Sequence, residues 1–310
     1  MAEIHKRYRP SYEAFKRKAR EHQIQFREKE LGVGFDKYPN VLTSSDAHKG
    51  LIFFEGFRDE ILKKLREPVP QTSSAPSGQM LTNLLRSEHI PYNVFFPMKK
   101  DFEGCKNLFN EVLDTNAIQK VLDILIEHHP EPIGDYLDDH TAFDVYIPYK
   151  DIDNRPCGIG IEVKYTEKEY PLIPGSREYK NVKDNSGKTR LALPYERATK
   201  ESGYYCADVK PDTLISNTFR QIWRNHILGA SMVLHGDIIQ FTSITLFPRE
   251  NNHFNIDAMP AYQKLLTDKA KTTCIPICYD RLFNLMEKYL NVEKKDEWID
   301  YLRRRYLLPK

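Results

Sequence analysis

The stretch TAFDVYIPYKDIDNRPCGIGIEVKYTE, residues 141–167, contains two short apolar runs, and each run carries charged residues in its middle. Asp144 interrupts the first run, and Glu162 and Lys164 interrupt the second. Ionised side chains are rarely buried in a strand unless they have a partner. The stretch therefore predicts two strands whose charged residues serve a purpose other than packing.

A hairpin is the simplest connection between the two runs, because the turn-like segment KDIDNRPC separates them. A hairpin centred on Asp153 places Val145 opposite Ile161 and Asp144 opposite Glu162. This single register gathers the apolar residues on one face and brings the two carboxylates together. The residues expected on the apolar face are Phe143, Val145 and Ile147 from the first strand and Ile159, Ile161 and Val163 from the second.

Directly opposed carboxylates repel each other unless a positive charge lies near them. Lys164 supplies one positive charge, but a divalent cation is the stronger solution, and two carboxylates with a backbone carbonyl suit Mg²⁺, for which Mn²⁺ would substitute. A lysine beside such a metal can orient or deprotonate the attacking water, while the metal polarises a phosphoryl oxygen. The pattern predicts phosphodiester hydrolysis. The competing interpretation is an ordinary solvated strand face, since this spacing also occurs by chance.

Composition sets broader limits on the function. The chain has 310 residues and a net charge of only +2, so an anion-binding surface requires local clustering of basic residues. The N-terminus has no apolar signal region and no run of about 18 apolar residues occurs, so we expect a cytoplasmic protein that does not span a membrane. The scattered spacing of the cysteines predicts reduced thiols; they are Cys105, Cys157, Cys206, Cys274 and Cys278.

Hydrophobic periodicity divides the chain into four segments. We expect a helical N-terminal extension (1–66), a linker rich in Pro and Ser (67–78), a core (79–250) with a polar insertion (166–212), and a helical C-terminal region (251–310). Within the core, AIQKVLDILIEHHP (117–130) is ambiguous between helix and strand. TLISNTFRQIWRNHILGASMVL (213–234) predicts a helix, and IIQFTSITLF (238–247) predicts a strand.

Asp144 together with Glu162-Val163-Lys164 resembles the motif of the PD-(D/E)XK nuclease superfamily. The segments MLTNLLRSEHIPYNVFF, YERATKESGYY, FRQIWRNHIL and LFPREN are similar to blocks of a bacterial family of restriction-endonuclease-like proteins, and together they cover roughly residues 15–255. The resemblance implies an α/β (α+β) restriction-endonuclease-like core, in which a central mixed sheet is flanked by helices. Helical additions would lie at both ends of the chain.

The resemblance also implies roles for individual residues. Asp144 and Glu162 would bind the metal, the carbonyl of Val163 would be a backbone ligand, and Lys164 would be the catalytic lysine. The residue before the aspartate is Phe143, where the motif has proline; this departure is common in the superfamily.

Two further assignments follow from the resemblance. Many members add an acidic metal ligand from the first core helix, for which Glu88 is our candidate and Glu111 and Glu127 are rivals; a surface or capping role for Glu88 stays open. The helix after the motif often projects polar side chains towards the catalytic lysine, and Gln221 fits that role. Its spacing places Gln221 on one helix face with Arg224 and Asn225. The alternative is that these three residues form an ordinary solvated polar face.

Basic residues cluster at both ends of the chain. Residues 1–30 contain nine Lys or Arg against five Glu, and Arg303, Arg304 and Arg305 form a second cluster. Such clusters suit contact with phosphate groups, although a solvated helix face is an equal alternative. The basic residues of the first cluster are Lys6, Arg7, Arg9, Lys16, Arg17, Lys18, Arg20, Arg27 and Lys29.

These observations predict a Mg²⁺-dependent endonuclease that acts on DNA in restriction, defence, repair or mobile-element processing, and that dimerises if it cuts both strands. The alternative of a different class is a catalytically silent nuclease-like fold that binds nucleic acid or protein. A third interpretation is a hydrolase of small phosphate esters.

Overall fold

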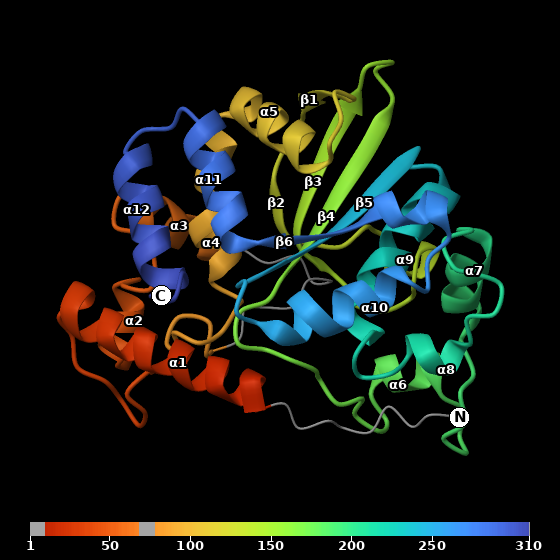
Figure 1. Cartoon of the computed structure of the whole chain (residues 1–310), viewed down its shortest axis with the longest axis horizontal. Coiled ribbons are helices and arrows are strands. Elements are labelled where there is room, and N and C mark those ends of the chain that lie inside the picture. The colour runs from red at the N-terminus through yellow and green to blue at the C-terminus, as the bar shows by residue number, and fades with distance from the viewer. Residues whose placement is uncertain (1–9, 68–77, 310) are drawn as a thin grey trace.

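The computed structural model describes residues 10–67 and 78–309 (Figure 1). Lys6, Arg7 and Arg9 of the basic N-terminal segment, and most of the predicted 67–78 linker, lie outside the described residues. The described chain is built on one mixed sheet with helices on both of its faces, as the sequence predicts.

Six strands form this sheet in the described part of the chain. Their spatial order is β1-β3-β4-β5-β6, and β2 pairs with β3 along the same edge as β1. The β4–β5 and β5–β6 pairs are parallel, and the remaining pairs are antiparallel. The strands are β1 (Ile118–Val121), β2 (Leu125–His128), β3 (Phe143–Asp151), β4 (Pro156–Val163), β5 (Gln240–Phe247) and β6 (Cys274–Cys278).

The β3–β4 hairpin has the predicted register. Val145 pairs with Ile161, and Ile147 pairs with Ile159. The turn is closed by Asp151, whose Oδ1 accepts the backbone N–H groups of residues 153 and 155. The ladder ends at the pair Val145 and Ile161, so the two strands part just before the predicted metal ligands.

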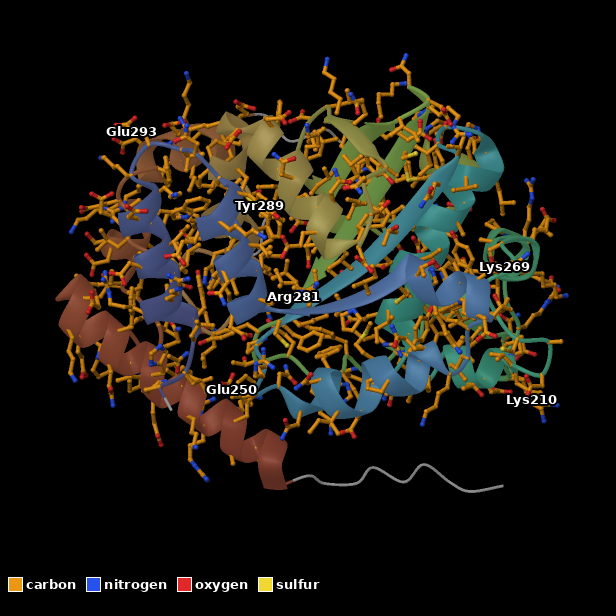
Figure 2. All side chains as sticks on the ribbon, turned by 45° about the horizontal axis from the view of Figure 1, so that its top comes forward. Lys210, Glu250, Lys269, Arg281, Tyr289 and Glu293 are labelled. Carbon is orange, nitrogen blue, oxygen red and sulfur yellow. The ribbon has the colours of Figure 1, made fainter. Side chains whose placement is uncertain are left out.

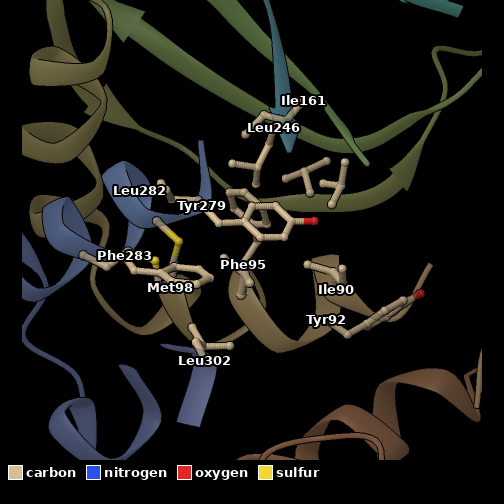
Figure 3. Packing of buried hydrophobic residues seen from close by; sticks show 14 of the residues in the cluster. Ile90, Tyr92, Phe95, Met98, Ile161, Leu246, Tyr279, Leu282, Phe283 and Leu302 are labelled. Atoms are coloured by element: carbon tan, nitrogen blue, oxygen red, sulfur yellow. The ribbon is translucent and has the colours of Figure 1, made fainter. Parts of the chain in front are cut away.

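Helices cover both faces of the sheet (Figure 1). A large apolar cluster, which we call the α11-side cluster, joins one face of β3, β4 and β5 to residues of α4 (Ile90–Val94), α5 (Phe102–Val112), α11 (Tyr279–Tyr289) and α12 (Lys295–Tyr306). Figure 3 shows its centre, where Ile161 and Leu246 of the sheet meet Tyr279 and Phe283 of α11. Burial of these large side chains stabilises the fold by about 1.5–3 kcal/mol for each one.

The opposite face carries a second apolar cluster, which we call the α9-side cluster. It is centred on α9 (Arg220–His235), the helix predicted from the sequence, whose Ile222, Trp223 and Ile227 are buried. Because β4 and β5 are parallel, a crossover must join them, and α9 is part of that crossover. The 166–212 insertion carries α6 (Arg177–Val182) and α7 (Leu193–Glu201), and α8 (Pro211–Leu214) begins at its end.

Phe143 departs from the predicted arrangement. Val145 and Ile147 pack in the α11-side cluster, as expected. Phe143 instead packs in the α9-side cluster, where its ring stacks on Tyr146 with the ring centroids 5.5 Å apart. A Cβ on Gly160 would lie 2.6 Å from the Phe143 ring, so the glycine leaves the space that this ring fills. The predicted face for Phe143 was therefore wrong, because simple alternation does not account for this space.

The first and last helices that the structure describes pack into the α11-side cluster. Phe15 and Phe26 of α1 (Pro10–Phe26) share it with Trp298 and Leu302 of α12. The other N-terminal elements are a π-helical turn (Arg27–Leu31), α2 (Ser44–His48) and α3 (Arg58–Leu65). Figure 2 shows side chains filling the space around these elements, with Tyr289 and Glu293 far from Lys210 and Lys269.

The C-terminal region is not wholly helical. A π-helical turn (His253–Ala258) and α10 (Met259–Gln263) lead into β6, which adds a strand parallel to β5 at the edge of the sheet. Pro276 lies within β6, and an edge strand tolerates proline because it needs fewer ladder hydrogen bonds. All five cysteines are free, as predicted.

Candidate active site

The predicted motif residues meet where β3 begins and β4 ends. Asp144 is the second residue of β3, Glu162 is the last but one of β4, and Lys164 follows that strand directly. The Asp144 carboxylate accepts the backbone N–H of Val163 through Oδ2, at 2.6 Å. The Asp144 carboxylate thus accepts a backbone N–H of β4 beyond the last backbone pair of the β3–β4 ladder. It therefore lies against the strand that carries Glu162.

Lys164 is held tightly at the centre of this site. Its ammonium group donates to Glu162 Oε1 at 2.5 Å and to Gln221 Oε1 at 2.7 Å. The residue is only 4% exposed. Its backbone carbonyl accepts the hydroxyl of Tyr279 at 2.6 Å, and its N–H donates to the carbonyl of Leu246 at 2.8 Å. The predicted approach of Gln221 to the lysine is therefore present in the structure.

Asn225 was not predicted to take part in the site. Its side-chain amide donates a hydrogen bond to Glu162 Oε2, so Glu162 is held by Lys164 through one oxygen and by α9 through the other. The sequence contains a signal for this contact, because Asn225 follows Gln221 by four residues and therefore lies one helical turn further along the same face. Asn and Gln on one face of α9 thus hold the carboxylate and the lysine.

Arg224 lies on the same predicted face but has a different set of contacts. It pairs with Asp139 at 3.1 Å and with Glu178 of α6 at 3.1 Å, and it donates to the hydroxyl of Tyr195 on α7 at 3.1 Å. These contacts fasten the 166–212 insertion to α9. Arg224 therefore supports the helix that presents Gln221 and Asn225, and it does not reach the motif residues by any contact of the described chain.

Charge crowding in the site is reflected in the pKa values. Burial raises the pKa of the Asp144 carboxyl well above its usual range, and the nearby charges of Glu162 and Glu127 raise it further. Burial opposes the charged form of Lys164, but the carboxylates of Glu162 and Asp144 outweigh this effect and raise the pKa of the ammonium group. The lysine therefore stays positively charged in this environment.

The three candidates for an additional acidic residue lie in different places. Glu111 lies on α5, where it pairs with Lys288 at 2.6 Å, away from the motif. Glu88 forms an ion pair with Arg86. Glu127 lies on β2, and burial, followed by the charges of Glu162 and Glu88, raises its pKa to about 7. Of the three, the electrostatics link Glu127 most directly to Glu162 and Asp144.

Glu127 also has an unusual backbone. Its φ angle is +54°, a left-handed conformation that is uncommon for a residue other than glycine. It interrupts a short strand that the sequence leaves ambiguous between helix and strand. Such a conformation costs about 1–3 kcal/mol and persists only where the surroundings enforce it. The ambiguity of residues 117–130 is the reason that Glu127 could not be ranked first from the sequence.

The donor set of this site fits a hard divalent cation. Asp144 and Glu162 offer carboxylate oxygens, which Mg²⁺ prefers, and the raised pKa of Asp144 shows that its charge needs compensation. No group of three or more His, Cys, Asp or Glu side chains is gathered into a metal-binding cluster within residues 10–67 and 78–309. Two carboxylates suit a cation that keeps several waters or binds together with a phosphate group.

The arginine cluster at 303–305 is occupied by contacts within the protein. Arg303 pairs with Glu287 at 2.8 Å, and Arg304 pairs with Asp300 and Glu30. Arg305 is completely buried, and its guanidinium lies over the Tyr306 ring. These contacts favour a structural role for the cluster over contact with nucleic acid.

Comparison with known proteins agrees with the geometry. The family profile described as PD-(D/E)XK nuclease superfamily matches residues 10–308. The chain belongs to the PD-(D/E)XK nuclease superfamily. No curated protein and no solved structure matches the chain. Membership in this superfamily confirms the restriction-endonuclease-like fold predicted from the sequence.

The PD-(D/E)XK assignment also sets the broad class of activity. It implies a nuclease that binds nucleic acid and, as is general in the superfamily, uses divalent metal ions. The match spans both helical additions as well as the sheet, so these additions belong to the family's sequence pattern. None of the helices that the structure describes is long and apolar enough to cross a membrane.

Proposed function

We propose that this protein is a Mg²⁺-dependent endonuclease that hydrolyses DNA phosphodiester bonds, with Mn²⁺ as a substitute metal. The observation that carries the proposal is the meeting of Asp144, Glu162 and Lys164 at one point of the sheet, where Gln221 holds the lysine. Restriction, phage defence, repair and mobile-element processing would all use this chemistry. A cytoplasmic location belongs to the same proposal, and so does a homodimer if the enzyme cuts both strands of a duplex.

Each residue of the site would have a separate role in catalysis. Asp144 and Glu162 would hold the metal through their carboxylates, together with the carbonyl of Val163. Lys164, kept positive by its neighbours, would donate hydrogen bonds to the attacking water or to a phosphoryl oxygen and thereby stabilise developing negative charge. Gln221 would keep the ammonium group directed into the site. Glu88, the predicted fourth ligand, ranks behind Glu127 in this proposal because an arginine engages it.

The reaction is a hydrolysis. The oxygen of a water molecule would attack phosphorus, the bond from phosphorus to one sugar oxygen would break, and the departing oxygen would take up a proton. Bound Mg²⁺ would polarise the phosphoryl group and favour ionisation of the attacking water.

A structural role alone explains this arrangement poorly. Burying two neighbouring carboxylates destabilises a protein unless the charges are compensated. A fold that only bound nucleic acid or protein would be more stable with one of the two acids replaced by a neutral residue. The retained pair therefore favours catalysis over the silent binding module.

A panel of substrates tests the proposal. Wild-type protein and Glu162→Ala would be incubated with supercoiled plasmid, single-stranded DNA, RNA and a small aryl phosphodiester in Mg²⁺, in Mn²⁺ and in EDTA. We expect the wild type alone to cut DNA, and only with a metal ion. No polynucleotide cleavage by either protein would support the silent module, and turnover confined to the small ester would support the third interpretation. Equal cleavage by both proteins would reveal contamination.

A further inference from the structure

A groove runs along the protein surface next to the candidate active site. Its volume is about 610 Å³, and it lies between α1 and the segment 166–170, with segments 38–41 and 83–86 forming the remaining walls. Tyr170 belongs both to this groove and to the active site, because its ring centre lies 5.5 Å from the Lys164 Nζ atom. The groove therefore shares one lining residue with the surroundings of the proposed catalytic lysine.

Basic side chains outnumber acidic ones in the lining of this groove, although Arg86 is paired with Glu88. Within residues 10–67 and 78–309, no acidic side chain forms an ion pair with Lys16 or Arg20 of α1. Glu167 is engaged by the chain itself, because its two oxygens accept the backbone N–H groups of Ser87 and Tyr165. The charged lining residues are Lys16, Arg20, Arg86 and Lys168, together with Glu167 and Glu169.

Two aromatic rings lie among these charges. Tyr38 is 56% exposed, and the ammonium group of Lys37 lies 5.5 Å from the centre of its ring. Tyr170 lies at the end next to Lys164, and its backbone carbonyl accepts a hydrogen bond from Arg220, the first residue of α9. The rings thus occupy two separate walls of a positively charged groove.

We propose that this groove binds an unpaired nucleic-acid strand that continues from the scissile phosphodiester, a proposal that rests on the nuclease function proposed above. Lys16 and Arg20 contact its phosphate groups, and Tyr38 and Tyr170 stack on its bases. Basic residues that follow the backbone, combined with aromatic rings, are the arrangement that binds single strands without sequence preference. A paired duplex cannot use the rings in this way, because its bases are already stacked on each other.

Binding measurements on the full chain test this proposal separately from catalysis. Fluorescence anisotropy with a labelled 20-nucleotide oligothymidine and with a duplex of equal length, both in EDTA, would report affinity without cleavage. The charge-reversal pair Lys16→Glu/Arg20→Glu removes groove charges. The matched control is Arg17→Glu/Lys18→Glu, because these exposed residues lie on the same helix and do not line the groove.

We expect the wild type to bind the single strand more tightly than the duplex. The groove pair should weaken single-strand binding about tenfold or more and reduce the slope of log K against log salt by about 0.7 for each lost phosphate contact. The control pair should weaken binding less than about threefold, since its distance from the strand leaves only a screened effect. Equal weakening by both pairs, or no weakening by either, would overturn the proposal.

Aromatic stacking has its own matched test. Tyr38→Ala should weaken single-strand binding about tenfold, while Phe35→Ala, which removes an exposed ring of the same loop outside the groove, should not. Equal effects would overturn the stacking role. If the wild type cleaves DNA but the groove variants bind the single strand as tightly as the wild type does, this inference alone is overturned. If the groove variants lose single-strand binding but the wild type cleaves no substrate, the proposed function alone is overturned.

Discussion

The side-chain oxygen of Gln221 accepts a hydrogen bond from the ammonium group of Lys164 at 2.7 Å, although the two residues are 57 positions apart in the chain. Glu162 accepts a second hydrogen bond from the same ammonium group. The α9 helix therefore fixes the lysine against the strand that carries its carboxylate partner. The geometry of the proposed catalytic site therefore depends on how α9 packs on the sheet.

Replacing Gln221 tests this dependence. Gln221→Ala frees one donor of the ammonium group, and we expect kcat to fall about 10–100-fold with KM little changed, as is typical when a supporting hydrogen bond at a metal site is lost. Gln240→Ala, at an exposed position that starts β5, should keep the wild-type rate. Steady-state cleavage of a labelled oligonucleotide measures both constants. An unchanged kcat in Gln221→Ala would show that the contact is incidental.

Glu127 should make the stability of the metal-free protein depend on pH. Its folded pKa of about 7 lies above the ordinary value of 4.5, so between these values the folded protein holds a proton that the unfolded chain has released. The free energy of unfolding therefore falls as the pH rises through this interval. Glu127→Gln should remove this fall in the free energy of unfolding. At pH 8 the variant's free energy of unfolding should exceed that of the wild type by at most about 3 kcal/mol, and at pH 4.5 the two values should be similar.

Urea unfolding in EDTA at several pH values measures this difference. Glu111→Gln is the matched control, because hydrogen bonds from Lys288 and Tyr289 lower the pKa of that exposed carboxyl. It should give no gain in stability at pH 8. A Glu127→Gln protein with the same pH dependence as the wild type would contradict the assignment of a buried, proton-holding carboxyl.

Mg²⁺ should stabilise the folded protein through Asp144. A ligand at ten times its dissociation constant stabilises the folded state by about 1.4 kcal/mol when it binds that state alone. The increase in Tm should be larger at pH 8 than at pH 6, because the raised pKa of Asp144 makes protons compete with the metal at the lower pH. Asp144→Asn should abolish the increase and, without metal at pH 8, should melt higher than the wild type.

Thermal unfolding followed by circular dichroism gives both comparisons. Asp59→Asn, an exposed position on α3, should retain the full response to Mg²⁺. A normal Mg²⁺ response in Asp144→Asn would place the metal elsewhere.

Parts of this site follow directly from the sequence. The strict alternation around Val145 and Ile161 admits one register, and that register brings Asp144 towards Glu162. The position of Phe143 could not be deduced, because it depends on the space left by a glycine on the neighbouring strand. The short apolar run of β2 fits either helix or strand, so the place of Glu127 also required the tertiary structure.

The role of Asn225 and the strand β6 were missed for different reasons. Helical spacing puts Asn225 near the site but does not tell which polar residue reaches Glu162, since that depends on how α9 packs on β4. The five residues of β6 contain a proline and have no alternation, so their pairing with β5 is a tertiary effect. In both cases the structure depends on long-range packing, which the local sequence pattern does not reveal.

Gly229 sets the distance between α9 and the sheet. A Cβ at this position would lie 2.0 Å from the Phe241 ring of β5, so an alanine must displace either the helix or the buried Phe241 ring. Alanine normally favours a helix by about 0.5–1 kcal/mol over glycine, but overpacking costs about 1–3 kcal/mol, and the second effect should prevail. Urea unfolding should therefore show Gly229→Ala destabilised, and Gly34→Ala, which meets nothing within 4 Å, unaffected. A stabilised Gly229→Ala would mean that α9 lies further from β5.

The most direct test of the active site is the single-turnover rate of Lys164→Ala on a DNA substrate that the wild type cuts. The account predicts that this variant, with Mg²⁺ present, is slower by about 10²–10⁴-fold, whereas Lys63→Ala on the exposed surface of α3 keeps the wild-type rate. Circular dichroism would confirm that the variant is folded. Cleavage by folded Lys164→Ala at the wild-type rate would contradict the claim that Asp144, Glu162 and Lys164 form the catalytic site.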